Sequence, residues 1–87
     1  MKKHTKIYLD YFGYDEGDYI PSEMSGKPAN GIHHIKLKSQ GGKDEIENLI
    51  ALTQDEHDRS HFKGVKEKWI YAEELFLIHN KFLNKWK

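Results

Sequence analysis

The sequence predicts an α+β fold in one domain spanning residues 1–87, with a central segment at 32–62 that reads strand, turn, strand and helix. The turn is indicated by two glycines at 41–42, because glycine adopts positive φ at little steric cost. The helix is indicated by His57 and His61, whose spacing places both on one face. Apolar residues then recur every three or four positions, which predicts a long C-terminal helix at about 66–86.

The N-terminal twenty residues are rich in aromatic side chains and become acidic towards their end. The stretch 5–12 predicts a short helix closed by Gly13, since glycine is the usual residue just after a helix. The run from Tyr8 to Phe12 also suits a strand, so both alternatives stay open. The acidic residues at 15–18 do not follow the spacing of an EF-hand, and we expect a solvated turn there.

Four histidines and one asparagine lie at the junctions of the central segment. His33 and His34 are adjacent on the first expected strand, Asn48 lies in the second, expected at 46–52, and two histidines share the helix. Imidazole nitrogens are common ligands of transition ions, so this layout suggests a metal site. Adjacent strand residues point to opposite faces, so the strand period alone does not bring His33 and His34 to one substrate group.

The motifs occur in the order His-His-Ile, Gly-Gly, Asn-Leu-x-x-Leu and His-x-x-x-His. In that order the chain resembles HNH endonucleases, which have the ββα-metal fold; the likeness covers Ile32 to Phe62. The resemblance implies a metal-dependent endonuclease that nicks or cuts DNA with low sequence specificity. The expected products carry 3′-hydroxyl and 5′-phosphate ends.

The resemblance also implies a role for individual residues. A divalent ion, with zinc, nickel, manganese and magnesium as alternatives, would be held by three histidines beside a histidine general base. An asparagine would tie down the loop and orient this base. The implied residues are His33, His57 and His61 as metal ligands, His34 as the base and Asn48 as the orienting residue. Should the ion bind elsewhere, the next histidines to test are His4 and His79.

The chain contains no cysteine. Many relatives carry two C-x-x-C pairs that form a zinc knuckle, and the resemblance maps these positions onto Ser22 and Ser25, then Thr53 and Glu56. Hydroxyl groups are poor zinc ligands beside thiolate and imidazole, so we expect a catalytic metal without the structural one. Thr53 and Glu56 instead match a capping box, which would start the helix.

Fourteen acidic and fourteen basic residues cancel, which predicts modest affinity for DNA. Six lysines around the glycine turn and after the histidine-bearing helix are candidates for phosphate contacts. Recruitment by another protein, or a homodimer through the C-terminal helix, would raise the affinity; otherwise this helix serves mainly as core. The six lysines are Lys36, Lys38, Lys43, Lys63, Lys66 and Lys68.

No signal peptide and no apolar run long enough to span a bilayer are visible, so we expect a soluble cytoplasmic protein without membrane contact. The resemblance is to small stand-alone members of phage type, which would act inside a bacterial host. The alternative function is a non-catalytic ββα module that binds DNA or a protein, for example as an accessory of a phage packaging complex. Retention of all five motif residues argues against that alternative.

Overall fold

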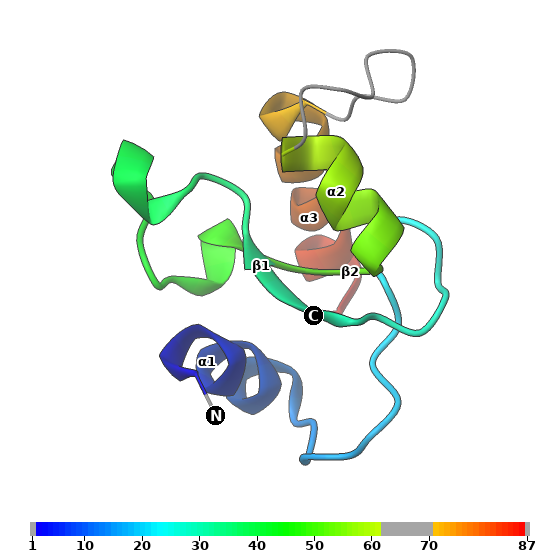
Figure 1. Ribbon diagram of the computed structural model, residues 1–87. Coiled ribbons are helices and arrows are strands. Elements are labelled where there is room, and N and C mark those ends of the chain that lie inside the picture. The colour runs from blue at the N-terminus through cyan, green and yellow to red at the C-terminus, as the bar shows by residue number, and fades with distance from the viewer. Residues whose placement is uncertain (1, 62–70, 87) are drawn as a thin grey trace.

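The computed structural model describes residues 2–61 and 71–86, except the side chains of His61 and Trp86. Two antiparallel strands and three α-helices make up a mixed α+β fold in these residues, as the sequence predicts (Figure 1). Two short 3-10 turns lie between the strands. The elements are α1 (Lys3–Phe12), β1 (Gly31–His34), η1 (Lys38–Gln40), η2 (Ile46–Asn48), β2 (Leu49–Leu52), α2 (Gln54–His61) and α3 (Ala72–Trp86).

The sheet is the centre of the described fold, and its two faces are covered by different helices. α1 lies on one side of the strands, and α2 and α3 lie on the other (Figure 1). All four residues of β2 are buried, so its apolar run belongs to a strand covered on both faces. In the register of the pair, His33 is opposite Ile50 and His34 is opposite Leu49.

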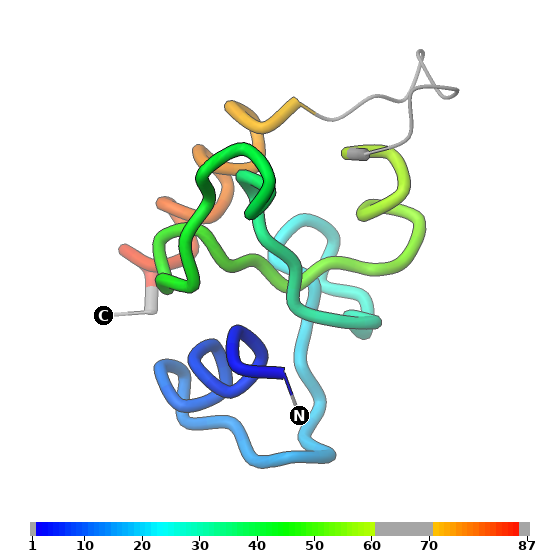
Figure 2. Tube along the Cα trace, turned by 60° about the vertical axis from the view of Figure 1, so that its left-hand side comes forward, coloured from blue at the N-terminus to red at the C-terminus, as the bar shows by residue number. Residues whose placement is uncertain are grey.

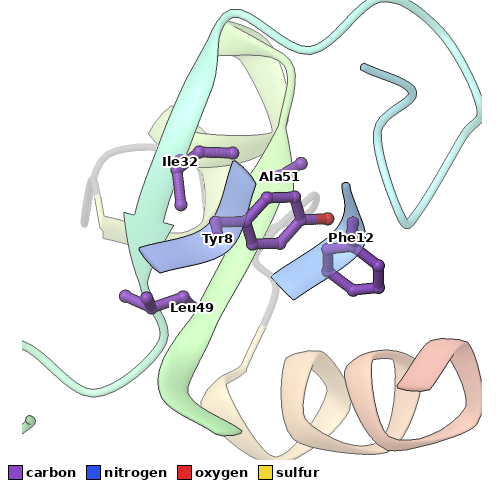
Figure 3. Packing of buried hydrophobic residues seen from close by; sticks show 5 residues of the cluster. All are labelled: Tyr8, Phe12, Ile32, Leu49 and Ala51. Carbon is purple, nitrogen blue, oxygen red and sulfur yellow. The ribbon is translucent and has the colours of Figure 1, made fainter. Parts of the chain in front are cut away.

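One apolar cluster joins α1 to the sheet. It contains Tyr8, Phe12, Ile32, Leu49 and Ala51, which come from the helix and from both strands (Figure 3). All five side chains are buried, and such burial contributes about 1.5–3 kcal/mol for each large apolar side chain. This cluster fixes α1 against β1 and thereby determines where the first turn of α1 lies.

The opposite face of the sheet packs against α3. Ile50 and Leu52 from β2 form a second cluster with Ile35 and with Leu75 of α3. Beside this cluster, His79 of α3 is fully buried. Further along, the ring of Phe82 lies 5.5 Å from that of Phe12, so the end of α3 also contacts α1.

A buried polar network crosses between these layers. Nδ1 of His79 lies 2.6 Å from Oε1 of Glu23, and Nε2 lies 2.5 Å from the carbonyl oxygen of Ile46. Tyr8 donates its hydroxyl to the other oxygen of Glu23, at 2.7 Å. Both nitrogens of His79 therefore face acceptors, and the residue ties α3 to η2 and to the loop before β1.

Several expected boundaries differ from the structure. The N-terminal element is a helix rather than a strand; it begins at Lys3 and ends before Gly13, whose φ is 74°. The second strand does not begin at 46: Ile46–Asn48 forms a 3-10 turn in which the amide of Asn48 donates to the carbonyl of Glu45. The side chain of Asn48 forms hydrogen bonds with the loop backbone, and β2 starts at Leu49, the residue after Asn48.

The C-terminal helix begins later than expected within the described residues. It starts at Ala72. Tyr71, which lies within the range expected to be helical, precedes the helix with 58% of its surface exposed, so its ring is not part of the buried apolar face. The expected helical residues at 66–70 lie outside the described part of the chain. None of the helices in the described ranges is long and apolar enough to cross a membrane.

Candidate catalytic and metal-binding site

His34 ends β1 and contacts a carboxylate from the following loop. Its Nε2 lies 2.6 Å from Oδ1 of Asp44, and the side chains of both residues are only 13% exposed. The other oxygen of Asp44 lies 3.1 Å from Nζ of Lys38. The hydrogen bond with His34, followed by the one with Lys38, lowers the pKa of Asp44 from its ordinary value. Asp44 is therefore an anion at neutral pH and accepts the Nε2–H of His34.

The loop between the strands brings Asp44 to His34. Figure 2 shows the chain leaving β1, turning back through η1 and η2, and entering β2 beside it. Gly41 has a φ of 88°, which favours glycine. A Cβ on Gly42 would lie 1.8 Å from the carbonyl oxygen of Lys36, so no other residue fits there without a shift of the backbone.

Asn48 holds this loop through three hydrogen bonds. Its Oδ1 accepts the amide of Lys36 at 2.8 Å, and its Nδ2 donates to the carbonyls of Lys36 and Lys43 at 3.0 and 3.1 Å. Asn48 is 8% exposed, so its polar atoms are satisfied by the loop rather than by solvent. Asn48 thus joins both ends of the turn that carries Asp44.

The first histidine of the pair contacts α2 instead. The rings of His33 and His57 stack with centroids 3.8 Å apart and planes 18° from parallel. Nε2 of His33 and Nδ1 of His57 are both buried. Burial lowers the pKa of His57, so this imidazole is neutral at cellular pH and has a lone pair for a metal ion.

The donor set fits a transition ion, because imidazoles gathered at one place are ligands that zinc and nickel prefer. Two of the three expected ligands, His33 and His57, are in contact. The third, His61, lies one turn further along α2, and its side chain is outside the described part.

The adjacent histidines point to opposite faces of β1, as the strand period requires, yet both border one cleft. This cleft has a volume of about 520 Å³, and its lining includes His4, His33, His34 and His57. It lies around the free edge of β1, which pairs with β2 alone among the described strands. A group bound at this edge could contact both histidines.

Asp44 was not among the expected site residues. The signal that could have found it is an acidic residue two positions after the glycine turn, where the loop returns towards the histidine pair. His4 is a further neighbour: its ring centroid lies 4.5 Å from that of His34. Its Nε2 lies 3.0 Å from the carbonyl oxygen of Ile32.

The four positions onto which the resemblance maps the cysteines, namely Ser22, Ser25, Thr53 and Glu56, lie around the Glu56 carboxylate. Ser22 donates its hydroxyl to Oε1 of Glu56 at 2.5 Å, and the amide of Thr53 donates to the same oxygen at 2.9 Å. The amide of Glu56 donates back to the Thr53 hydroxyl at 3.2 Å, which confirms the capping box. Ser25 also forms a hydrogen bond with Glu56. A hydrogen-bonded cluster thus occupies the place of a metal knuckle.

The lysines expected to contact phosphate are only partly described. Lys36 and Lys43 are exposed on the loop between the strands. Lys38 is 64% exposed, but its ammonium group pairs with Asp44. The remaining three, Lys63, Lys66 and Lys68, lie outside the described residues.

Comparison with protein families gives a match that covers much of this chain. A family model described as HNH endonuclease matches residues 15–63, more than half of the 87 residues. The matched region contains both histidine pairs, the asparagine and the glycine turn. Neither the curated proteins nor the solved structures gave a match.

Proposed function

Because the chain belongs to the HNH endonuclease family, we propose that it hydrolyses phosphodiester bonds of DNA with the help of one divalent ion. The observation that carries this proposal is the pairing of His34 with Asp44 at a cleft that His33 and His57 also line. A base and a candidate metal-binding pair then lie on either side of one strand edge. Such an arrangement supports phosphodiester hydrolysis, because a base can activate water while an ion stabilises the charge on phosphate.

His34 is the proposed general base. When its Nε2–H donates to Asp44, Nδ1 keeps the only lone pair of the neutral ring. That lone pair takes the proton of the attacking water while the water oxygen bonds to phosphorus. The bond from phosphorus to the 3′ oxygen breaks, and this oxygen takes up a proton from solvent, which leaves a 3′-hydroxyl and a 5′-phosphate. The Asp44 carboxylate stabilises the imidazolium that forms.

His33, His57 and His61 are the proposed ligands of the ion. When bound, a divalent ion supplies positive charge that stabilises the developing negative charge on phosphate and on the leaving oxygen. Burial keeps His57 neutral and able to donate its lone pair. An all-imidazole site favours zinc or nickel over manganese and magnesium, which prefer oxygen ligands.

DNA binding is proposed to rest on the exposed lysines of the loop, Lys36 and Lys43, together with the three at positions 63–68. Lys38 contributes less positive charge, because Asp44 offsets it. A net charge of zero supports modest affinity and low sequence specificity from this segment alone. A recruiting protein or a homodimer would then supply the rest.

The proposed function is tested by nicking of supercoiled plasmid in zinc, nickel, manganese and magnesium, each with and without excess chelator. We expect cleavage with at least one transition ion and none with chelator. The matched variant is His34→Ala, which should retain the fold and lose about 10²–10⁴-fold in rate, the usual effect of removing a general base. Absence of cleavage with every ion, or near-normal cleavage by the variant, would contradict the proposal.

A further inference from the structure

Three possible metal ligands from three separate segments meet on the face of β1 that contacts α1. His4 comes from the first turn of α1, His34 ends β1, and Asp44 lies on the loop between η1 and η2. One ligand atom from each lies within 4.8 Å of the other two. In the described part of the chain, no other group of three histidines or carboxylates is this close.

We propose that His4, His34 and Asp44 form a second ion site, selective for transition dications such as Zn²⁺, whose occupation switches the nuclease off. The site is separate from His33 and His57, which contact each other on the opposite face of the strand. Two imidazoles and one carboxylate are a frequent zinc-binding set. The inhibitory part rests on the proposed role of His34 as base, whereas binding of the ion does not.

His4 is oriented as a metal-binding histidine usually is. Its Nε2–H donates to the carbonyl oxygen of Ile32, 3.0 Å away, so Nδ1 is the nitrogen with a free lone pair. A ring that donates one N–H to a carbonyl while the other nitrogen binds the ion is the common arrangement around metal-bound histidine. Burial, and then repulsion from His34, lower the pKa of His4, which favours the neutral, ligating form.

Asp44 is able to change partners. Oδ1 accepts from His34 and Oδ2 pairs with Lys38, whose side chain is 64% exposed. The ammonium group of Lys38 belongs to a side chain that water can solvate, so a bound dication can displace it from Asp44 at small cost. The neighbouring cleft, of about 520 Å³, borders His4 and His34 and gives an ion and its remaining water ligands access.

Occupation of this site removes the base because a neutral imidazole has a single lone pair. If Nε2 of His34, the nitrogen next to Asp44, binds the ion, Nδ1 must carry the proton. If the ion binds Nδ1 instead, that lone pair is occupied directly. In either case His34 cannot accept a proton from water. The same carboxylate thus supports the base when it holds an N–H and disables the base when it holds a metal.

Binding is tested by equilibrium dialysis of the full chain against Zn²⁺, with metal counted per chain. We expect two ions for the wild type, one for His4→Phe, one for His57→Ala and none for the double variant. Phenylalanine keeps a ring beside His34 but has no ligand atom. Asp44→Asn, which removes the carboxylate by another route, should also bind one ion. Two ions in both His4→Phe and Asp44→Asn, or a single ion in the wild type, would overturn the second site.

Inhibition is tested by the ratio of nicking rates at excess and at stoichiometric Zn²⁺, so that each protein is its own reference. The wild type should lose at least about 10-fold at excess Zn²⁺, and His4→Phe should lose none, because loss of even an outer partner weakens metal binding about 10–100-fold. Excess Mg²⁺ should inhibit neither protein, since magnesium avoids imidazole. Equal inhibition of both proteins by Zn²⁺ would refute the switch. If no protein nicks DNA at all, the proposed function fails while dialysis still decides the site.

Discussion

Nε2 of His34 lies 2.6 Å from Oδ1 of Asp44, across a glycine turn that separates the two residues by ten positions. This contact determines which nitrogen of the ring carries the proton. With Nε2–H bonded to the carboxylate, the lone pair is on Nδ1. Asp44 is therefore a positioning residue for the proposed base, and it acts through His34 rather than on the substrate.

Removing this carboxylate should slow cleavage without abolishing it. For Asp44→Ala we expect a rate about 10–100-fold below wild type, which is the usual effect of losing the partner of a functional histidine. The rate of Asp44→Asn should lie between those of the wild type and Asp44→Ala, because its amide oxygen can still accept the N–H of His34. The measurement is nicking of supercoiled plasmid at saturating DNA, where kcat falls and KM changes little.

The control for this series is Asp10→Ala. Asp10 also pairs with a lysine, Lys6, at 3.0 Å, but both side chains are exposed on α1. Its removal should leave the rate within about twofold of wild type, since exposed pairs contribute little. A wild-type cleavage rate for Asp44→Ala would exclude a positioning role for Asp44.

If His57 is a ligand of the activating ion, removing its side chain should change the dependence of nicking on ion concentration. His57→Ala should raise the ion concentration that gives half-maximal nicking by more than about 100-fold, since losing a ligand should exceed the effect of losing an outer partner. His34→Ala should leave that concentration unchanged, although it lowers the maximal rate. A shift of the midpoint in His34→Ala but not in His57→Ala would move the activating ion to the other face of β1.

The order of elements was predictable because short local signals determine it. The glycine turn at 41–42 and the capping box from Thr53 to Glu56 each act over a few residues, and both occur in the structure. Ile46 misled the strand prediction, because its apolar side chain fits a strand as well as it fits the 3-10 turn observed. The types of the central elements followed from the pattern, whereas the starts of α1, β2 and α3 did not.

Long-range polar contacts could not be predicted in the same way. Glu23 and His79 are 56 positions apart, and their contact depends on how α3 packs against the sheet. No periodic pattern distinguishes a buried, paired histidine from a surface histidine. The same holds for Asp44, whose distance from His34 depends on the path of the loop as well as on the turn.

The Glu23–His79 contact predicts a large effect on stability. His79→Ala should lower the free energy of unfolding by about 3–5 kcal/mol, because it leaves the buried Glu23 carboxylate and the Ile46 carbonyl without the ring that contacts both. The double variant Glu23→Gln with His79→Leu should recover part of that loss, since no buried charge remains. Urea unfolding measures both. If the double variant lost more free energy of unfolding than the two single variants together, the Glu23–His79 contact would not be the source of the stability.

Chelation should affect activity and folding separately. Since hydrogen bonds join Ser22 and Thr53 to Glu56 at the expected knuckle positions, we expect the fold to need no metal there. Chelator should abolish nicking but leave a cooperative thermal transition, lowered only by the loss of bound ions. Far-UV circular dichroism with and without chelator makes the measurement. An unfolded chain at 25 °C after chelation would mean that a metal is required for the fold.

The charge on Glu56 predicts how stability depends on pH. Burial alone would raise the pKa of this carboxyl, but hydrogen bonds from Ser22, Ser25 and Thr53 outweigh burial and lower it below the ordinary value of 4.5. A carboxyl whose pKa is lower in the folded state stabilises the fold above its unfolded pKa, and this contribution is lost as the pH falls through the folded value.

Glu56→Gln should therefore cost about 1 kcal/mol at pH 7, since charge-assisted hydrogen bonds are roughly twice as strong as neutral ones. The difference from wild type should shrink as the pH falls below 4.5. Urea unfolding across this range tests the prediction, with Glu47→Gln on the exposed part of η2 as the matched control. A difference between wild type and Glu56→Gln that stays constant with pH would mean that shape, and not charge, makes Glu56 stabilising.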